Sequence, residues 1–226
     1  MIHNKGIKLV STSIYINPPS WLEIPNYDED YLVLDKDVTR EEVDLFLLGL
    51  FIYNYIPFTE DSEASIQNLL KALTDGIVLG GGLMFFEGDK KILPSCCCGL
   101  EQWQEAIEDI SQKIGVWLGH DPMPIIEYQE HSILVLSDDY NKPSCPVKSK
   151  SDLVCIEFST TELECFLAQI KDDIKDFFEI PFRKRLNEID SNNSDRVVSA
   201  VMAEFDVFYE YDKNFKSLSN ISIPLD

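Results

Sequence analysis

The sequence predicts a single α+β domain in which several amphipathic helices pack on a mostly antiparallel sheet. Predicted strands and helices alternate without regular strand–helix–strand units, which argues against a parallel doubly wound sheet. No repeat, linker or low-complexity tract interrupts the 226 residues. A chain of this length buries roughly 70% of its unfolded surface, so a core needs no metal or disulfide. Residues 1–226 are therefore expected to form one acidic globular domain.

Strands are predicted where β-branched and aromatic residues cluster between turn signals. The predicted strands cover residues 6–16, 31–34, 77–86, 125–128, 133–136 and 153–158. Gly80-Gly81-Gly82 suggests a phosphate-binding loop, but Leu83 to Phe86 continue the strand and no Gly-Lys-Ser/Thr follows. We therefore predict a bulge or a close backbone approach at these glycines, and no nucleotide site.

Helices are predicted where apolar residues recur three or four positions apart. The predicted helices cover residues 40–53, 63–73, 100–114, 161–177 and 196–209. Thr39 with Glu42, and Thr161 with Glu164, match the capping box that begins a helix. The nine residues from Leu45 to Tyr53 are too few to cross a bilayer, which takes about 20. That segment is expected to be a helix buried on all sides or docked against a partner.

Charge is the most unusual property of the composition. Forty Asp and Glu face nineteen Lys and Arg, which leaves a net charge of −21. Such a field repels phosphate backbones and anionic membranes, and it attracts basic proteins. From Glu23 to Asp44, nine acids outnumber two basic residues, which favours this segment as a docking face. The alternative is that the acids serve solubility alone.

The one basic cluster, Arg183-Lys184-Arg185, is too small for nucleic acid. Its three charges are expected to complement the dipole at the end of the long helix.

Cysteine usage and the N-terminal sequence bear on the compartment. The six cysteines are not spaced like a secreted disulfide framework: three are consecutive and three are scattered. No apolar run follows Met1 as a secretion signal would. Reduced thiols in a cytoplasmic protein are the simpler expectation. No cofactor is predicted, because no motif for one is present.

Four residues form the candidate functional site: Cys96, Cys97, His120 and Asp121. Thiols at a helix N-terminus lose pKa units to the helix dipole, and a His beside a carboxylate can act as a base or metal ligand. The alternative is structural, with the cysteines buried as small apolar residues and Gly119 to Pro122 shaping a turn. Three adjacent cysteines cannot all face one metal on a regular strand.

The predicted helix 100–114 separates the cysteines from His120 and Asp121, and its length helps to decide between these alternatives. Its roughly 15 residues span about 22 Å, so the loop after it must fold back for His120 to approach Cys96 or Cys97. We expect an ordered turn near the cysteine segment. Because nothing in the sequence forces the loop to fold back in this way, the geometry favours separate structural roles for the cysteines and for His120.

Residues 80–127 resemble a family of uncharacterised bacterial proteins. Their shared pattern is Cys-Cys-x-x-Leu-x-x-Trp, here Cys96 to Trp103, then Trp-Leu-Gly-His-Asp-Pro-x-Pro, here Trp117 to Pro124. Cys98 is a local addition to that pattern. The resemblance implies a bacterial origin and a site or structural knot around the four candidate residues, and it implies no established activity.

Two hypotheses follow. The first is an acidic binding protein that docks a basic partner, for example an immunity-type inhibitor of a toxin, by analogy alone. The second is a metal- or thiol-dependent site built from Cys96, Cys97 and His120. No catalytic motif is recognisable, so binding is favoured over enzyme activity.

Overall fold

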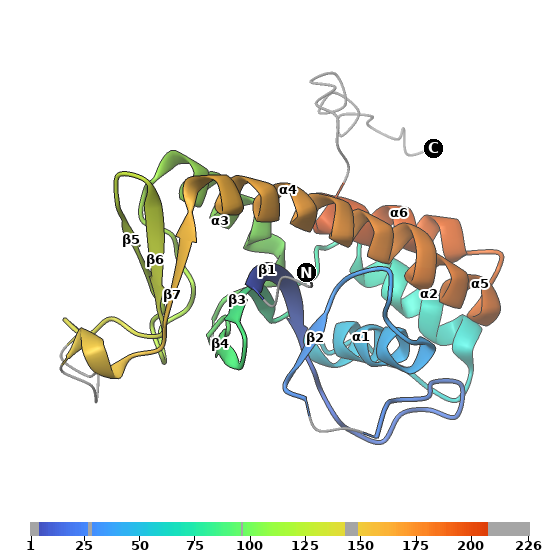
Figure 1. The fold of residues 1–226 in the computed structure, drawn as a ribbon. Helices are drawn as coiled ribbons and strands as arrows, with labels where there is room; N and C mark the ends of the chain where they lie inside the picture. Colours follow the sequence, from blue (N-terminus) through green and yellow to red (C-terminus); the bar gives the residue numbers. More distant parts are fainter. Residues whose placement is uncertain (1–4, 27–28, 96, 143–148, 208–226) are drawn as a thin grey trace, which may run out of the picture.

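The structure is a computed structural model that describes residues 5–26, 29–95, 97–142 and 149–207. Its strands form two antiparallel sheets, and the helices pack with both sheets around one hydrophobic core (Figure 1). The predicted α+β fold is therefore confirmed, with the strands divided between two sheets instead of gathered in one.

The first sheet has four strands in the order β2-β1-β3-β4. These are β1 (Lys5–Thr12), β2 (Tyr31–Val33), β3 (Gly81–Glu87) and β4 (Lys90–Ile92). Strand β3 pairs with β1 along most of its length. A Cβ on Gly81 would lie 2.3 Å from the carbonyl oxygen of Val10, so only glycine fits there. The predicted close backbone approach is confirmed.

The second sheet has the order β5-β6-β7 and stands at one end of the molecule (Figure 1). Its strands are β5 (Ile125–Tyr128), β6 (Ser132–Leu136) and β7 (Cys155–Ser159). The long helix α4 (Thr160–Phe177) follows β7 directly and packs on β1, where Lys8 bonds Asp173 at 2.7 Å.

The start of α4 differs from the prediction. Ser159 is the N-cap and forms the capping box with Glu162, so the predicted box of Thr161 and Glu164 is wrong. Both tetrads fit the pattern Ser/Thr-x-x-Glu. The strand decides between them, because Ser159 still pairs with Ser132 and the helix begins at the next residue.

The remaining helices are short, apart from α1. They are α1 (Arg40–Tyr53), α2 (Ser62–Ala72), η1 (Leu100–Gln102), α3 (Trp103–Gln112), η2 (Lys150–Asp152), η3 (Phe178–Phe182), α5 (Arg183–Ile189) and α6 (Ser194–Glu204). Residues 43–51 of α1 are all buried, so the predicted burial on every side holds for the middle of this helix, whereas Tyr53 at its end is exposed. Its Phe46 ring contacts the rings of Phe177, Phe178 and Phe182 at 5.0–5.9 Å.

One buried ion pair joins α1 to α5. Arg185 donates to both carboxylate oxygens of Asp44, at 2.6 and 3.0 Å, and to the carbonyl oxygen of Trp21 at 2.7 Å. Burial raises the pKa of Asp44, while the bonds from Arg185 and from the Glu23 amide oppose that rise. The predicted role of the basic cluster is therefore wrong: it begins α5 after the wide turn η3, and Arg185 points into the core.

Three helices end in the same way, with a residue other than glycine in the left-handed conformation. Tyr55 after α1, Lys113 after α3 and Asp206 after α6 have φ of 54°, 56° and 50°. In each case this residue and the next donate backwards to carbonyls of the last turn, as in a Schellman motif. The predicted helices 100–114 and 196–209 therefore end earlier, at Gln112 and Glu204, while residues 208–209 lie outside the described residues.

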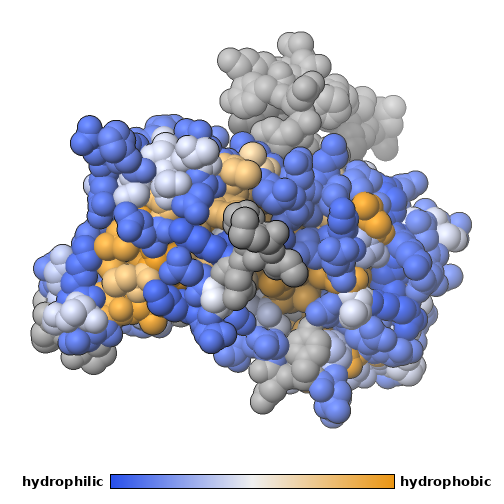
Figure 2. Space-filling view, in the orientation of Figure 1, coloured by the Kyte–Doolittle hydropathy of each residue, from blue (hydrophilic) through white to orange (hydrophobic). Residues whose placement is uncertain are grey.

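Most of the surface in this view is hydrophilic, with an apolar area over the three-stranded sheet (Figure 2). Within the described ranges, no helix is both long enough and apolar enough to span a membrane.

Candidate functional site

The two halves of the predicted site lie next to each other. Cys97 is in the turn before η1, and His120 and Asp121 are in the connection from α3 to β5. Ser95 joins the segments: its amide donates to the Leu118 carbonyl, and its hydroxyl accepts from the Asp121 amide, both at 3.1 Å. The chain after α3 therefore folds back along the cysteine segment. Cys96 lies outside the described residues.

His120 is held in an ordered turn. Its ring stacks on Trp117 at 6.0 Å between centroids, and its Nε2 lies 3.5 Å from Oδ2 of Asp121. Lys142 donates to the His120 carbonyl oxygen and to Oδ1 of Asp121, the latter at 2.9 Å. That bond from Lys142 lowers the pKa of Asp121. The carboxylate is thus shared between a lysine and an imidazole, which holds the turn together.

The thiols that the structure describes in this segment differ in environment. Cys98 is buried, and burial together with the Glu101 carboxylate raises the pKa of its thiol to about 11. Cys97 is exposed and has a left-handed backbone with φ of 64°. Cys98 is therefore protonated at neutral pH and behaves as an apolar side chain.

In the described part of the chain, no three His, Cys, Asp or Glu side chains converge as metal ligands would. The predicted metal- or thiol-dependent site thus depends on Cys96.

A patch of exposed apolar side chains surrounds Cys97. We define the aromatic patch as Tyr53, Tyr55, Val78, Cys97 and Trp117, all of them exposed. Hydrogen bonds link neighbouring segments of the patch. The side chain of Asn54 donates to and accepts from the Val78 backbone at 2.8 Å, and the Trp117 indole donates to the Cys97 carbonyl oxygen at 3.4 Å.

Tyr53 connects the two sides of this patch. Its ring packs against the backbone at Gly80, which bridges to Gly99. Burial raises the pKa of Tyr53, and the neighbouring charges of Glu101 and Cys97 add to the rise. The end of α1, the start of β3 and the cysteine turn therefore share one surface.

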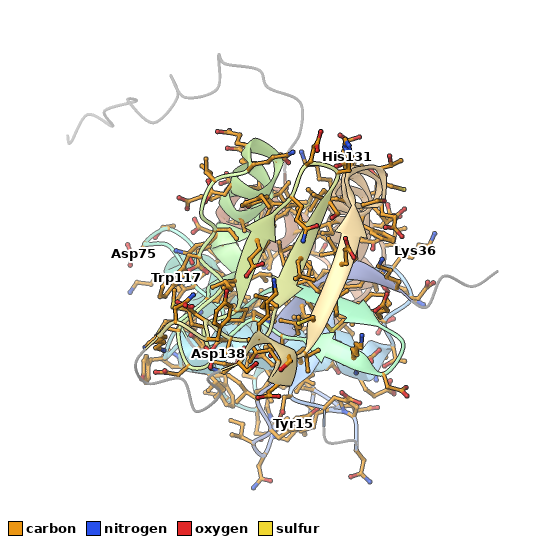
Figure 3. The ribbon with its side chains drawn as sticks, turned by 60° about the vertical axis from the view of Figure 1, so that its left-hand side comes forward. Tyr15, Lys36, Asp75, Trp117, His131 and Asp138 are labelled. Carbon is orange, nitrogen blue, oxygen red and sulfur yellow. The ribbon has the colours of Figure 1, made fainter. Side chains whose placement is uncertain are left out.

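The segments that build the aromatic patch are acidic. Residues 50–57, 75–82 and 97–121 contain six Asp and Glu and one basic residue, Lys113. The six acids are Asp75, Glu101, Glu105, Glu108, Asp109 and Asp121. Trp117 and Asp75 appear on the same side of the molecule in Figure 3, and Lys36 appears on the opposite side. The only cation that the structure places on these acids through an ion pair, within the described residues, is Lys142 on Asp121.

In the acidic segment predicted as a docking face, three of the nine acids form ion pairs within the protein. Asp44 is buried against Arg185, Glu23 pairs with Arg40 at 3.1 Å, and Asp35 pairs with Lys8 at 3.3 Å. Sequence reasoning missed the aromatic patch because exposed Tyr53 and Trp117 carry no local signal that separates them from buried aromatic residues.

Comparisons with known proteins gave no relative from which the role of this surface could be inferred. Neither a scan of protein-family models nor searches of curated proteins and solved structures found a match. The resemblance of residues 80–127 to a bacterial family therefore stays a prediction.

Proposed function

We propose that the chain is a binding protein that docks a basic protein partner, for example as an immunity-type inhibitor in a bacterial cytoplasm. The observation that carries this proposal is the acidic character of the segments around the aromatic patch, which contain six acids and one Lys. Charge of one sign on one face raises the rate of encounter with an oppositely charged protein. The same charge disfavours nucleic acid and anionic membranes as partners.

The alternative, a metal- or thiol-dependent site of Cys96, Cys97 and His120, has narrower support. The turn that holds His120 lies beside the cysteine segment through Ser95 and Trp117. Zinc titration of the purified protein tests it, with His120→Ala as the variant. Stoichiometric zinc binding that the variant loses would support the alternative.

The binding proposal is tested with a matched pair of charge variants. Basic proteins captured from an extract of the cells that carry the gene are purified, and their association rate is measured across a salt series. Glu105→Gln with Glu108→Gln removes two exposed charges of α3, the helix that follows the cysteine turn. Glu164→Gln with Asp172→Asn removes two exposed charges of α4. We expect the α3 pair to slow association more than the α4 pair, and salt to abolish the difference.

Equal effects of the two pairs, or association that salt does not slow, would contradict the proposal. Either result would mean that the acids near the patch do not guide a basic partner.

A further inference from the structure

The aromatic patch exposes four large side chains on neighbouring segments of the chain. Tyr55 is 93% exposed, and Tyr53, Val78 and Trp117 are each 41–48% exposed. Contiguous exposed apolar residues with a polar border are typical of protein interaction sites, and Tyr and Trp are the residues most enriched there. Hydrogen bonds link the segments that carry these side chains, and these segments are the acidic ones described above.

The Trp117 side of the patch is held in place before any partner arrives. The Trp117 ring is fixed by its bond to Cys97 and by stacking on His120. Tyr55 sits in a left-handed backbone that costs a side-chain-bearing residue free energy, and the ring gains almost no burial in return. A rigid aromatic surface loses little conformational entropy on binding.

The charges around the patch and the shape of the surface indicate which kind of molecule binds there. A second copy of the chain would bring the same acids against each other in a two-fold contact, which like-charge repulsion disfavours. A small molecule would need a hollow. One groove of about 370 Å³ lies between α3, β6 and α4, and a shallow hollow lies beside α5. Neither of them is lined by a residue of the aromatic patch.

We infer that the aromatic patch is the contact surface for a basic protein, and that it receives an arginine-bearing apolar segment of that protein. This inference rests on the proposed function. A guanidinium stacks on Trp and Tyr rings through cation–π contacts while neighbouring carboxylates accept its hydrogen bonds. The patch offers both, since Glu101 lies beside Tyr53 and Cys97.

Site-specific crosslinking tests the location of the contact. The photocrosslinker p-benzoylphenylalanine replaces Tyr55 in one variant and Ile180, which is 51% exposed beside α5, in the control. Both proteins are irradiated in an extract of the cells that carry the gene. We expect one basic protein to be captured at position 55 and not at 180. Capture of a second copy of this chain, equal capture at both positions, or no capture at 55 overturns the inference.

Dissociation kinetics with the captured partner separate this inference from the proposed function. We expect Tyr55→Gly and Trp117→Leu to speed dissociation at least about ten-fold, because central aromatic contacts dominate binding energy. Trp117→Phe keeps a ring and should lose less, while Lys113→Gly makes the same backbone change after α3 and should leave the dissociation rate unchanged. If association still depends on the α3 charges but Tyr55→Gly dissociates at the wild-type rate, the proposed function stands and this inference fails.

Discussion

Replacing Tyr55 with glycine is expected to make the fold more stable, although it removes a large side chain. Tyr55 occupies the position after the end of α1 where helices usually place glycine. Its amide donates to Ile52 at 3.1 Å, and the amide of Ile56 donates to Phe51 at 2.8 Å. Glycine keeps both bonds, because they use only the backbone.

The expected gain follows from two opposing terms. A left-handed backbone costs a residue with a Cβ about 1–2 kcal/mol. Glycine gives back about 0.5–1 kcal/mol of this, because its unfolded chain has more freedom to lose. The Tyr55 side chain is 93% exposed, so almost no burial is lost. Tyr55→Gly should therefore raise the free energy of unfolding by up to about 1.5 kcal/mol, or the Tm by up to about 6 °C.

Urea denaturation followed by circular dichroism measures this change. Lys113→Gly is the matched control, because Lys113 has the same role after α3, with φ of 56°. Both variants should gain stability with an unchanged dependence on urea. A loss of stability in Tyr55→Gly alone would refute the reasoning, since it would mean that the ring makes contacts that hold the fold together.

Three further predictions concern the core, the long helix and the thiols. Asp44→Ala leaves the buried Arg185 without its carboxylate and should cost about 3–5 kcal/mol in urea unfolding. The double variant Asp44→Leu with Arg185→Met should cost less than Asp44→Ala alone, and a larger cost would contradict the ion-pair argument. Ser159→Ala should lower the free energy of unfolding by about 1 kcal/mol through loss of the N-cap of α4; no change would mean that the helix begins elsewhere. Because the pKa of Cys98 is raised to about 11, iodoacetamide at pH 8 should modify the exposed Cys165 and spare Cys98 in the folded protein. Modification of Cys98 should become fast only as the pH approaches 11, and rapid reaction at pH 8, read by mass spectrometry, would contradict its burial.

Local signals in the sequence predicted the parts of the fold that local interactions decide. The capping box of Thr39 and Glu42 begins α1 as expected, because both bonds lie within three residues. The same rule was ambiguous at Ser159 and Thr161, since two overlapping tetrads satisfy it and only strand pairing chooses. Helix ends were harder to predict where Lys113 or Asp206 takes the left-handed position that glycine usually marks.

Interactions between distant residues could not be predicted from the sequence. Nothing in the sequence near Asp44 indicates that it pairs with Arg185, which lies 141 positions away. The pairing places both charges in the core instead of on the surface. For the candidate site, the sequence selected Cys97, His120 and Asp121, which the structure brings into one region. It missed Tyr53 and Tyr55, because exposure is decided by how separate segments pack and not by residue type.

The buried pair of Asp44 and Arg185 has a consequence for how the chain folds as it is synthesised. Helix α1 leaves the ribosome early, with nine consecutive residues that are buried only in the finished protein. The aromatic rings and the guanidinium that enclose it come from residues 177–185, more than 130 positions later. At about 5–20 residues per second, that interval lasts several seconds or longer. During this time the face of α1 that packs on these later residues stays uncovered, although Trp21 and Phe58 can already contact Phe51, so the nascent chain is a natural substrate for chaperones until α5 has emerged.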